Sequence, residues 1–293
     1  MMIQEQTVVC NVWNASHFVL KCWTFQKNWL RFMNTLEANL TTFSDNMTTD
    51  NKYWEIMTRQ MDIVEKSEQE KFKNSRITVI GCGGIGGQTI EMLARMGVGE
   101  LVLVDEDVFD WTNLNRQTFA TVNDIGLEKS EVAKQKVESI NPYVKVINFT
   151  KHVDLTNVDE LIGNSDIVID ALDNITTRVI VSRKAREYKI PFIHGAIHGT
   201  LGQVTVFLSN TKSYEEMFNL PSLGKELNDE TLGELKGISS GTPPALGPAP
   251  NLIGCLEATE AFKIITGVGK VTVAPKILTF DLLNFESFEI EEL

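Results

Sequence analysis

The stretch RITVIGCGGIGG, residues 76–87, restricts the possible folds of this chain more than any other. An apolar run ends abruptly in a series of glycines, as it does where a buried strand turns sharply into a helix. Glycine permits such a turn and lets the backbone approach a phosphate group, which the N-terminus of the following helix attracts. The stretch therefore predicts a nucleotide-binding strand–turn–helix unit.

Short β-branched runs alternate with helical segments from residue 76 to about residue 197. This alternation is typical of βαβ units and a parallel sheet. After HGTLGQ the pattern changes, because QVTVFL and KILTFDLLNFESFEI alternate as antiparallel strands do. We predict an α/β fold with a Rossmann-like, doubly wound and mostly parallel sheet that continues into antiparallel strands.

Residues 1–50 differ in composition from the rest of the chain. They hold three of its five tryptophans and two of its four cysteines, with aromatic side chains on all sides of a possible helix. We predict a poorly ordered N-terminal extension or a segment upstream of a misplaced start, with Met47 as the alternative beginning; a real extension that packs on the domain or on a partner is the other interpretation. Residues 51–293 are expected to form one domain, with a polar loop at about 211–250.

Charge and composition exclude several classes of protein. The net charge of −12 argues against a nucleic-acid groove, which needs a basic surface. No apolar run approaches the ~20 residues of a membrane span, and no signal peptide is recognisable, so a cytoplasmic location is expected. The cysteines Cys10, Cys22, Cys82 and Cys255 form no Cys-x-x-Cys pair, which argues against a disulfide framework and a zinc knuckle.

The glycine turn has an acidic partner on the next predicted strand. Gly81-x-Gly83-x-x-Gly86 is followed by Asp105 at the tip of ELVLVD. A carboxylate at this place commonly bonds a ribose diol. The combination predicts nucleotide binding, but it does not distinguish NAD from ATP.

Cationic and amide side chains come directly after Asp105. Asn113, Asn115 and Arg116 lie in DWTNLNRQ, and Lys129 lies near the start of the next predicted helix. Arginine and lysine bind phosphate oxygens where charge develops during phosphate cleavage. A dehydrogenase has little need of them here, so the set favours ATP.

A group of acidic and amide residues closes another parallel strand. Asp170, Asp173 and Asn174 lie in DALDN. Ligands of doubly wound sheets bind outside the carboxyl ends of the strands, which brings Asp173 to the crevice of the glycine turn. Magnesium beside a triphosphate takes one or two carboxylates together with phosphate oxygens. We therefore predict a phosphate-cleaving site with Asp173 as the magnesium ligand.

At about residues 53–283 the chain resembles the ThiF/MoeB/HesA family, which is related to the ubiquitin-activating enzymes. The motifs that carry the resemblance are YWEIMTRQ, GCGGIGG, VDEDVFDWTNLNRQ, the lysine of GLEKSEVA, DALDN, GQVTVF and IGCLEATEAFKIITG. The resemblance implies binding of ATP and Mg²⁺ and adenylation of the C-terminal glycine of a small ubiquitin-like protein. It also implies a homodimer.

The resemblance carries roles over to individual residues. The implied nucleotide-binding set comprises Gly81, Gly83, Gly84, Gly86, Asp105, Asn113, Arg116, Lys129 and Asn174. Within it, Asp105 would hold the ribose hydroxyls, Asn113 and Arg116 would contact the phosphates, and Lys129 would stabilise their charge. The implied catalytic set is Arg116, Lys129, Asp173 and Arg59. In this set Arg59 would reach into the partner subunit's site like an arginine finger.

The chain departs from many relatives in its cysteines. The regions where those relatives carry zinc-binding Cys-x-x-Cys pairs read SNTKSYEEMFNLPSLG and FDLLNFESFEIEEL, so we predict no zinc. The loop at 211–250 also lacks the cysteine that some relatives use to form a covalent adduct. We therefore expect the acyl adenylate to pass to a separate sulfur donor or acceptor.

Other reactive side chains receive structural interpretations. Cys255 is expected to begin a helix and to behave as a small buried residue, and Cys82 to pack inside the glycine turn. His194 and His198 lie in a predicted strand and turn, where their spacing does not bring two metal ligands onto one face. We expect structural histidines, with polar lining of the nucleotide crevice as the alternative.

The function that explains most of these residues is adenylation of a ThiS- or MoaD-like sulfur carrier with a Gly-Gly tail, in thiamine, molybdopterin or related biosynthesis. An NAD(P)-dependent oxidoreductase would explain only the glycines and Asp105. Adenylation of another carboxylate or of a tRNA nucleoside by the same fold, and a non-catalytic scaffold, are the other hypotheses. The acidic charge argues against the tRNA hypothesis.

Overall fold

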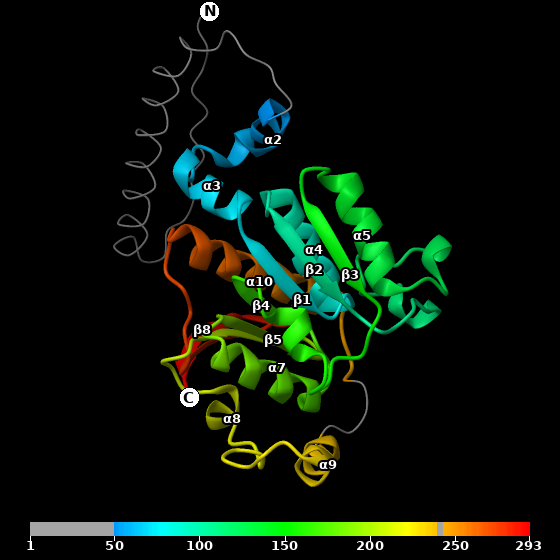
Figure 1. Ribbon diagram of the computed structural model, residues 1–293, viewed down its shortest axis with the longest axis vertical. Coiled ribbons are helices and arrows are strands. Elements are labelled where there is room, and N and C mark those ends of the chain that lie inside the picture. Colours follow the sequence, from blue (N-terminus) through cyan, green and yellow to red (C-terminus); the bar gives the residue numbers. More distant parts are fainter. Residues whose placement is uncertain (1–49, 239–242) are drawn as a thin grey trace, which may run out of the picture. The chain divides into compact units, whose positions relative to one another are not determined.

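The computed structural model describes residues 50–238 and 243–293 of the chain. Their centre is an eight-stranded sheet of order β3-β2-β1-β4-β5-β6-β7-β8 (Figure 1). The strands are β1 Arg76–Ile80, β2 Glu100–Val104, β3 Lys145–Phe149, β4 Ile167–Asp170, β5 Phe192–His198, β6 Leu201–Phe207, β7 Lys276–Asp281 and β8 Asn284–Glu292. The first five strands are parallel, and β6, β7 and β8 join them in antiparallel pairs. The predicted fold class is therefore confirmed.

Nine α-helices and three 3₁₀ turns of the described residues flank and connect these strands. They are α2 Asp50–Met57, η1 Thr58–Gln60, α3 Lys66–Lys73, α4 Gly84–Met96, η2 Trp111–Asn113, η3 Val122–Asp124, α5 Lys129–Ile140, α6 Val158–Ile162, α7 Ile175–Glu187, α8 Tyr214–Met217, α9 Asp229–Ile238 and α10 Pro248–Thr266, of which η1, η2 and η3 are the 3₁₀ turns. Among the described residues, none of the helices has both the length and the apolar character needed to cross a membrane.

The chain divides into two compact units, Met1–Glu55 and Ile56–Leu293. Of the first unit the structure describes only the beginning of α2, at residues 50–55. The N-terminal extension predicted at 1–50 thus lies outside the described residues, apart from Asp50, and stays a prediction. The second unit contains all the strands named above and all the residues discussed below.

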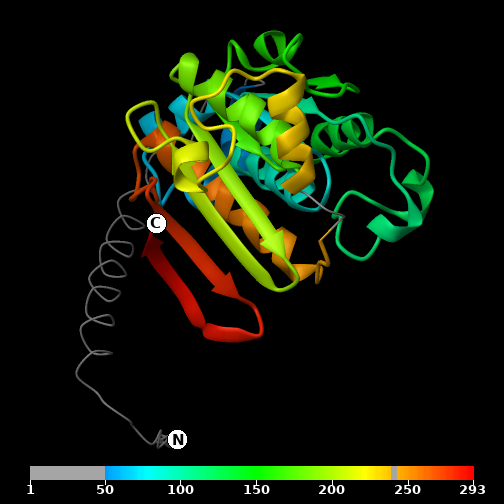
Figure 2. The same cartoon turned by 90° about the horizontal axis from the view of Figure 1, so that it is seen from below.

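Helices cover both faces of the sheet because the strands are apolar on both faces. In β2, Leu101 and Leu103 enter one buried cluster with α4, α5 and α10, while Val102 and Val104 enter another with α6 and α7. Successive side chains of a strand point to opposite faces, so such uninterrupted apolar runs are typical of a sheet buried on both sides. The antiparallel strands extend this sheet, and the β7–β8 hairpin (red in Figure 2) forms its edge.

The segment 211–250 is more regular than the predicted loop. It contains α8, α9 and the start of α10. Ser213 accepts a hydrogen bond from the Glu216 backbone at 3.1 Å in a capping box, and Asn228 accepts one from Thr231 at 3.0 Å at the start of α9. Such caps satisfy free N–H groups of a first turn and so stabilise short helices. The prediction of a loop throughout this segment was wrong.

The expectation that Cys255 begins a helix was also wrong. Helix α10 begins at Pro248, since proline suits the first turn, where its missing N–H group would have no partner. Cys255 therefore lies inside the helix and is half-buried. Burial raises the pKa of its thiol, and the partial positive charge of a helix N-terminus is absent there.

Glu257 of α10 is fully buried between α4 and β5. Its Oε2 accepts a hydrogen bond from Thr89 Oγ at 2.8 Å, whereas its Oε1 has no partner among the described residues. This oxygen lies only 2.3 Å from the position that a Cβ atom on Gly195 would occupy. Burial raises the pKa of the Glu257 carboxyl well above its ordinary value. The folded protein therefore keeps this proton where the unfolded chain releases it.

Stability should accordingly depend on pH through Glu257. Because its pKa is raised in the folded state, its contribution is complete below the ordinary value of about 4.3 and is lost as the pH rises. Glu257→Gln removes this titration. Urea unfolding measures the free energy of unfolding of variant and parent at pH 5 and at pH 8. The difference, variant minus parent, should be more than roughly 1 kcal/mol larger at pH 8 than at pH 5. An unchanged difference between variant and parent would contradict a protonated Glu257.

Candidate active site

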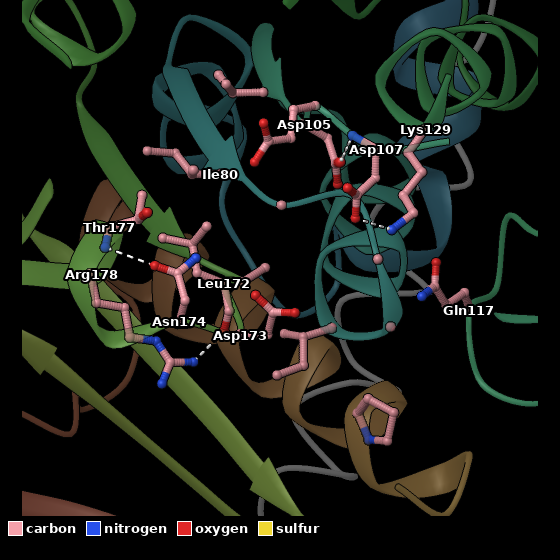
Figure 3. Close-up of a pocket in the computed structure, with 18 of the residues that line it drawn as sticks. Ile80, Asp105, Asp107, Gln117, Lys129, Leu172, Asp173, Asn174, Thr177 and Arg178 are labelled. Atoms are coloured by element: carbon pink, nitrogen blue, oxygen red, sulfur yellow. Dashed lines mark hydrogen bonds and ion pairs between the residues drawn. The ribbon is translucent and has the colours of Figure 1, made fainter. Parts of the chain in front are cut away.

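A pocket of about 340 Å³ lies at the carboxyl ends of β1, β2, β4 and β5 (Figure 3). Strand β1 pairs with β2 on one side and with β4 on the other, so the chain order reverses here. Crevices at such switch points are the usual ligand sites of doubly wound sheets. Its charged and polar lining residues are Asp105, Glu106, Asp107, Arg116, Gln117, Lys129, Lys151, His152, Asp173, Asn174, Thr177 and Arg178.

The glycines of the turn serve two different purposes. Gly81 has a φ of +98°, and a Cβ atom there would lie 2.4 Å from the Ala171 carbonyl oxygen. A Cβ atom on Gly86 would lie 1.8 Å from the Gly81 carbonyl oxygen, so Gly86 allows α4 to pack closely against the turn and does not itself line the pocket. Gly83 and Gly84 do line it. In the described part of the chain, no side chain caps α4 at Gly83, which leaves its first N–H groups available to an anion.

Gly86→Ala should destabilise the fold by more than about 3 kcal/mol, because the clash is with rigid backbone. Gly233→Ala in α9 is the matched control, since a Cβ atom there meets nothing within 4 Å. In that helix alanine should stabilise by up to about 1 kcal/mol. Urea unfolding of both variants measures the difference. A Gly86→Ala variant as stable as the parent would show that the turn packs less closely than described.

Asp105 joins the glycine turn to the loop after β2. Its Oδ2 accepts a hydrogen bond from Cys82 N at 2.6 Å, and its Oδ1 accepts one from Asp107 N at 2.8 Å. Burial raises the pKa of this carboxyl, and the charge of Lys129 acts in the opposite direction. Asp105 thus presents fixed acceptor atoms beside the turn.

Two cations reach the pocket from different segments. Lys129 begins α5, and its nearly buried Nζ forms an ion pair with Asp107 at 2.8 Å. Arg116 Nη1 donates to the Thr112 carbonyl at 2.7 Å and to Asn115 Oδ1 at 2.9 Å. Both cations line the same pocket as Gly83 and Gly84. Their charges are therefore placed where a phosphate group at the start of α4 would lie.

A free carboxylate faces these cations across the pocket. Asp173 is exposed, and among the described residues it has neither a hydrogen bond nor an ion pair. Its neighbour Asn174 caps α7 by accepting a hydrogen bond from Thr177 N at 2.8 Å. The described residues contain no group of three or more acidic, histidine or cysteine side chains that could enclose a metal ion. A single carboxylate fits Mg²⁺ that takes its other ligands from phosphate and water.

Three predicted site residues lie outside the pocket lining: Gly86, described above, Asn113 and Arg59. Asn113 is buried, and its Oδ1 accepts a hydrogen bond from Asp110 N at 3.0 Å, which stabilises the 3₁₀ turn η2. Arg59 is exposed beside Gln60, whose amide donates to the carbonyl of Met96 at the last residue of α4. Since α4 has 13 residues, a rise of ~1.5 Å per residue puts its two ends about 20 Å apart. The chain's own Arg59 therefore lies far from its own glycine turn.

The sequence prediction missed several lining residues. Gln117 is 7% exposed, and its Oε1 has no partner among the described residues although its amide lies beside Gly83. Its position directly after Arg116 was the available signal. Pro243, Ala245 and Pro250 bring the proline-rich segment to the pocket. At the rim His152 Nδ1 lies 2.7 Å from Glu106 Oε1.

The two histidines of HGAIHG lie in different environments of the same strand, β5. His194 is buried, and its Nδ1 lies 2.7 Å from Asp170 Oδ2, while His198 is exposed at the end of β5. Burial lowers the pKa of His194, and the hydrogen bond to Asp170 opposes this change. Neither histidine lines the pocket. The structural interpretation thus holds for His194.

Fold and pocket together describe an α/β protein with a charged pocket at the switch point of its sheet, where folds of this class bind their ligands. The chain belongs to the ThiF family, whose sequence model matches residues 57–292. The resemblance that the motifs indicated is therefore confirmed. Family membership implies the use of ATP, so it decides between the two uses of the glycine turn in favour of ATP.

Curated relatives and solved structures agree with this assignment. The chain is 36% identical to the SAMP-activating enzyme E1 of Haloferax volcanii over 225 residues, 76% of this chain and 79% of that protein. It is 31% identical to the molybdopterin-synthase adenylyltransferase of Haemophilus influenzae over 230 residues, 78% of this chain and 89% of that protein. Its fold matches that of E. coli MccB crystallised with ATP, with a TM-score of 0.65 and 23% identity over 77% of this chain and 65% of that one.

Proposed function

We propose that this protein is an adenylyltransferase that uses ATP to activate the C-terminal glycine carboxylate of a small ubiquitin-like sulfur carrier. The convergence of Arg116, Lys129 and Asp173 on the glycine turn carries this proposal, because a hydride-transferring enzyme would leave all three without a task. The names of the relatives, which act on molybdopterin synthase or on SAMP, support it. The pathway that the activated carrier supplies, thiamine, molybdopterin or another, follows from the carrier.

The chemistry follows from the poor leaving group of a carboxylate. Attack of the carrier's terminal carboxylate oxygen on the α-phosphorus of ATP breaks the bond to the β-phosphate oxygen and releases pyrophosphate. The chain holds the ribose at Asp105 and the phosphates at the start of α4, and it neutralises the developing charge with Arg116 and Lys129. Magnesium held by Asp173 would share the charge on the phosphate oxygens. The product is a mixed acyl–phosphate anhydride.

We propose that the sulfur nucleophile that attacks this acyl adenylate belongs to another molecule. Within the described residues, burial raises the pKa of the thiols of both Cys82 and Cys255. A thiol is nucleophilic as thiolate, which a raised pKa disfavours. Neither side chain lines the pocket.

Cys255→Ser should therefore leave adenylation within about twofold of the parent, because a half-buried serine keeps the size of the thiol. Pyrophosphate exchange measures the first half-reaction, and transfer of the carrier to a thiol measures the second. Loss of either, in a variant that folds and binds ATP normally, would show that this chain supplies the sulfur nucleophile.

We further propose that the active form is a homodimer in which the partner's Arg59 completes the site. The distance between the chain's own Arg59 and its glycine turn supports an action across an interface. So do four exposed apolar side chains of the segment between β2 and α5, which also carries Arg116; they are Val108, Trp111, Val122 and Leu127. Exposed apolar patches commonly mark protein–protein contacts.

ATP–pyrophosphate exchange tests the proposed function. The purified chain is incubated with ATP, Mg²⁺, labelled pyrophosphate and candidate carriers that end in Gly-Gly, with a tail-deleted carrier as control. Exchange that requires the intact tail would establish carboxylate adenylation and identify the carrier. ATP binding without exchange for any carrier would favour the tRNA-directed or scaffold hypotheses, and the absence of ATP binding would overturn the proposal.

A further inference from the structure

A cluster of buried charged side chains, of which only Arg178 lines the pocket, has no task in the mechanism above. Asp170, at the end of β4, is fully buried and pairs with Arg178 Nε at 3.0 Å and with His194 Nδ1 at 2.7 Å. Burial alone would raise the pKa of Asp170, but the charge of Arg178 and the hydrogen bond of His194 hold it below its usual value. The three side chains join β4, α7 and β5.

Arg178 also binds backbone carbonyls, one of which precedes the free carboxylate. Its Nη2 donates to the Leu172 carbonyl oxygen, shown by a dashed line in Figure 3, and lies 3.4 Å from the Gly195 carbonyl oxygen. The Leu172 N–H in turn donates to Asp170 Oδ1 at 3.0 Å. The cluster thus holds both polar groups of the Leu172 backbone, immediately before Asp173.

Asp173 depends on this backbone for its position. Its carboxylate has no partner of its own among the described residues, while Asn174 on its other side is tied to the start of α7. Asp173 therefore lies between two residues, Leu172 and Asn174, that are held in place by hydrogen bonds. A shift of Leu172 would move the carboxylate with nothing else in the described part of the chain to hold it.

Arginine suits this task for a geometric reason. Its planar guanidinium can bind a carboxylate and two carbonyl groups at once, which the single ammonium group of lysine cannot do in fixed directions. Replacing a buried ion pair by apolar residues is often neutral for stability, so a buried pair is weak support for a purely stabilising role. Control of position explains this arrangement better.

We propose that Arg178 is a positioning residue that fixes the Asp173 carboxylate for the magnesium ion, and that His194 supports it by holding Asp170 in place. This inference rests on the proposed function, in which Asp173 carries magnesium. Groups that orient a metal ligand typically change metal affinity by about 10- to 100-fold when they are lost. The effect should therefore appear in how strongly Mg²⁺ promotes ATP binding.

Titration calorimetry of ATP binding with and without Mg²⁺ provides the test without relying on turnover. Arg178→Lys should bind ATP without Mg²⁺ as the parent does, but the enhancement by Mg²⁺ should fall about tenfold. Arg183→Lys is the matched control on the same helix. Arg183 binds Glu215 at 2.6 Å and the carbonyls of Ser222 and Lys225, outside the pocket. It should keep the full enhancement.

Asp173→Asn separates this inference from the function on which it rests. Loss of the enhancement in Asp173→Asn but not in Arg178→Lys would overturn the positioning role and leave the proposed function intact. An undiminished enhancement in Asp173→Asn would remove both the metal role and the inference. Near-UV circular dichroism verifies the fold of each variant.

A second pair of variants decides the matter if Arg178→Lys does not fold. His194→Asn keeps an N–H donor near the place of Nδ1, whereas His194→Leu removes it at similar size. The Mg²⁺ enhancement should persist in His194→Asn and fall in His194→Leu. Equal enhancement in the two variants would overturn the inference.

Discussion

A one-to-one mixture of Arg59→Ala and Asp173→Ala subunits, each inactive alone, is expected to recover about a quarter of the parent exchange activity. Loss of an arginine finger alone typically costs 10³- to 10⁵-fold in rate, so the starting activities should be close to zero. In a mixed dimer, the subunit with intact Asp173 receives Arg59 from its partner and works. The other site lacks both residues.

The expected fraction follows from counting sites. Random pairing makes half of the dimers mixed, and each mixed dimer has one working site out of two, so about a quarter of all sites are active. Co-expression with two different tags, followed by two affinity steps, isolates the mixed dimer. This preparation should then recover about half of the parent activity.

A mixture of Arg116→Ala and Asp173→Ala is the matched control. Arg116 and Asp173 line the same pocket of one chain, so every site of the mixed dimer lacks one of them. It should therefore stay inactive. Recovery in the control would mean that Arg116 or Asp173 also acts in the site of the partner subunit. No recovery with Arg59→Ala, in a dimer verified by native mass spectrometry, would show that Arg59 does not act across the interface.

The strand ends could be predicted from the sequence because parallel strands must bring their carboxyl ends to one edge. Gly83, Asp105 and Asp173 each follow an apolar run, and the structure brings all three to one pocket. The same reasoning located Lys129 and Arg116 on the segments that cross this edge. The hydrophobic periodicity of a strand and the residue types of the turn after it are enough to predict where such residues lie, since their positions follow from the elements that precede them.

The parts that the sequence did not reveal depend on pairings between distant segments. Asp170 meets His194 across two neighbouring strands, and Arg178 reaches back over a loop to a backbone carbonyl. No local pattern distinguishes such buried charges from surface ones. Asn113 carried a family motif, yet its side chain stabilises its own turn. Local hydrogen bonding of an Asn side chain competes with ligand binding, and the sequence alone does not decide between them.

Asp173→Ala is expected to lower the rate of pyrophosphate exchange by about a thousandfold or more, as the loss of a group that stabilises charge in the transition state commonly does. The fold should be unaffected, because the carboxylate is exposed and has no partner among the described residues. Its free energy of unfolding should thus stay within about 0.5 kcal/mol of the parent value. Single-turnover exchange assays and urea unfolding measure the two quantities.

Asp229→Ala is the control, since it removes an equally exposed carboxylate outside the pocket. It should leave exchange unchanged. The double variant Asp173→Ala with Arg116→Ala should lose much less than the product of the two single losses, because groups that act on the same charge are not additive. Fully multiplicative losses would mean that Asp173 and Arg116 act on separate steps. The metal site and the cation site would then have to be assigned to different parts of the reaction.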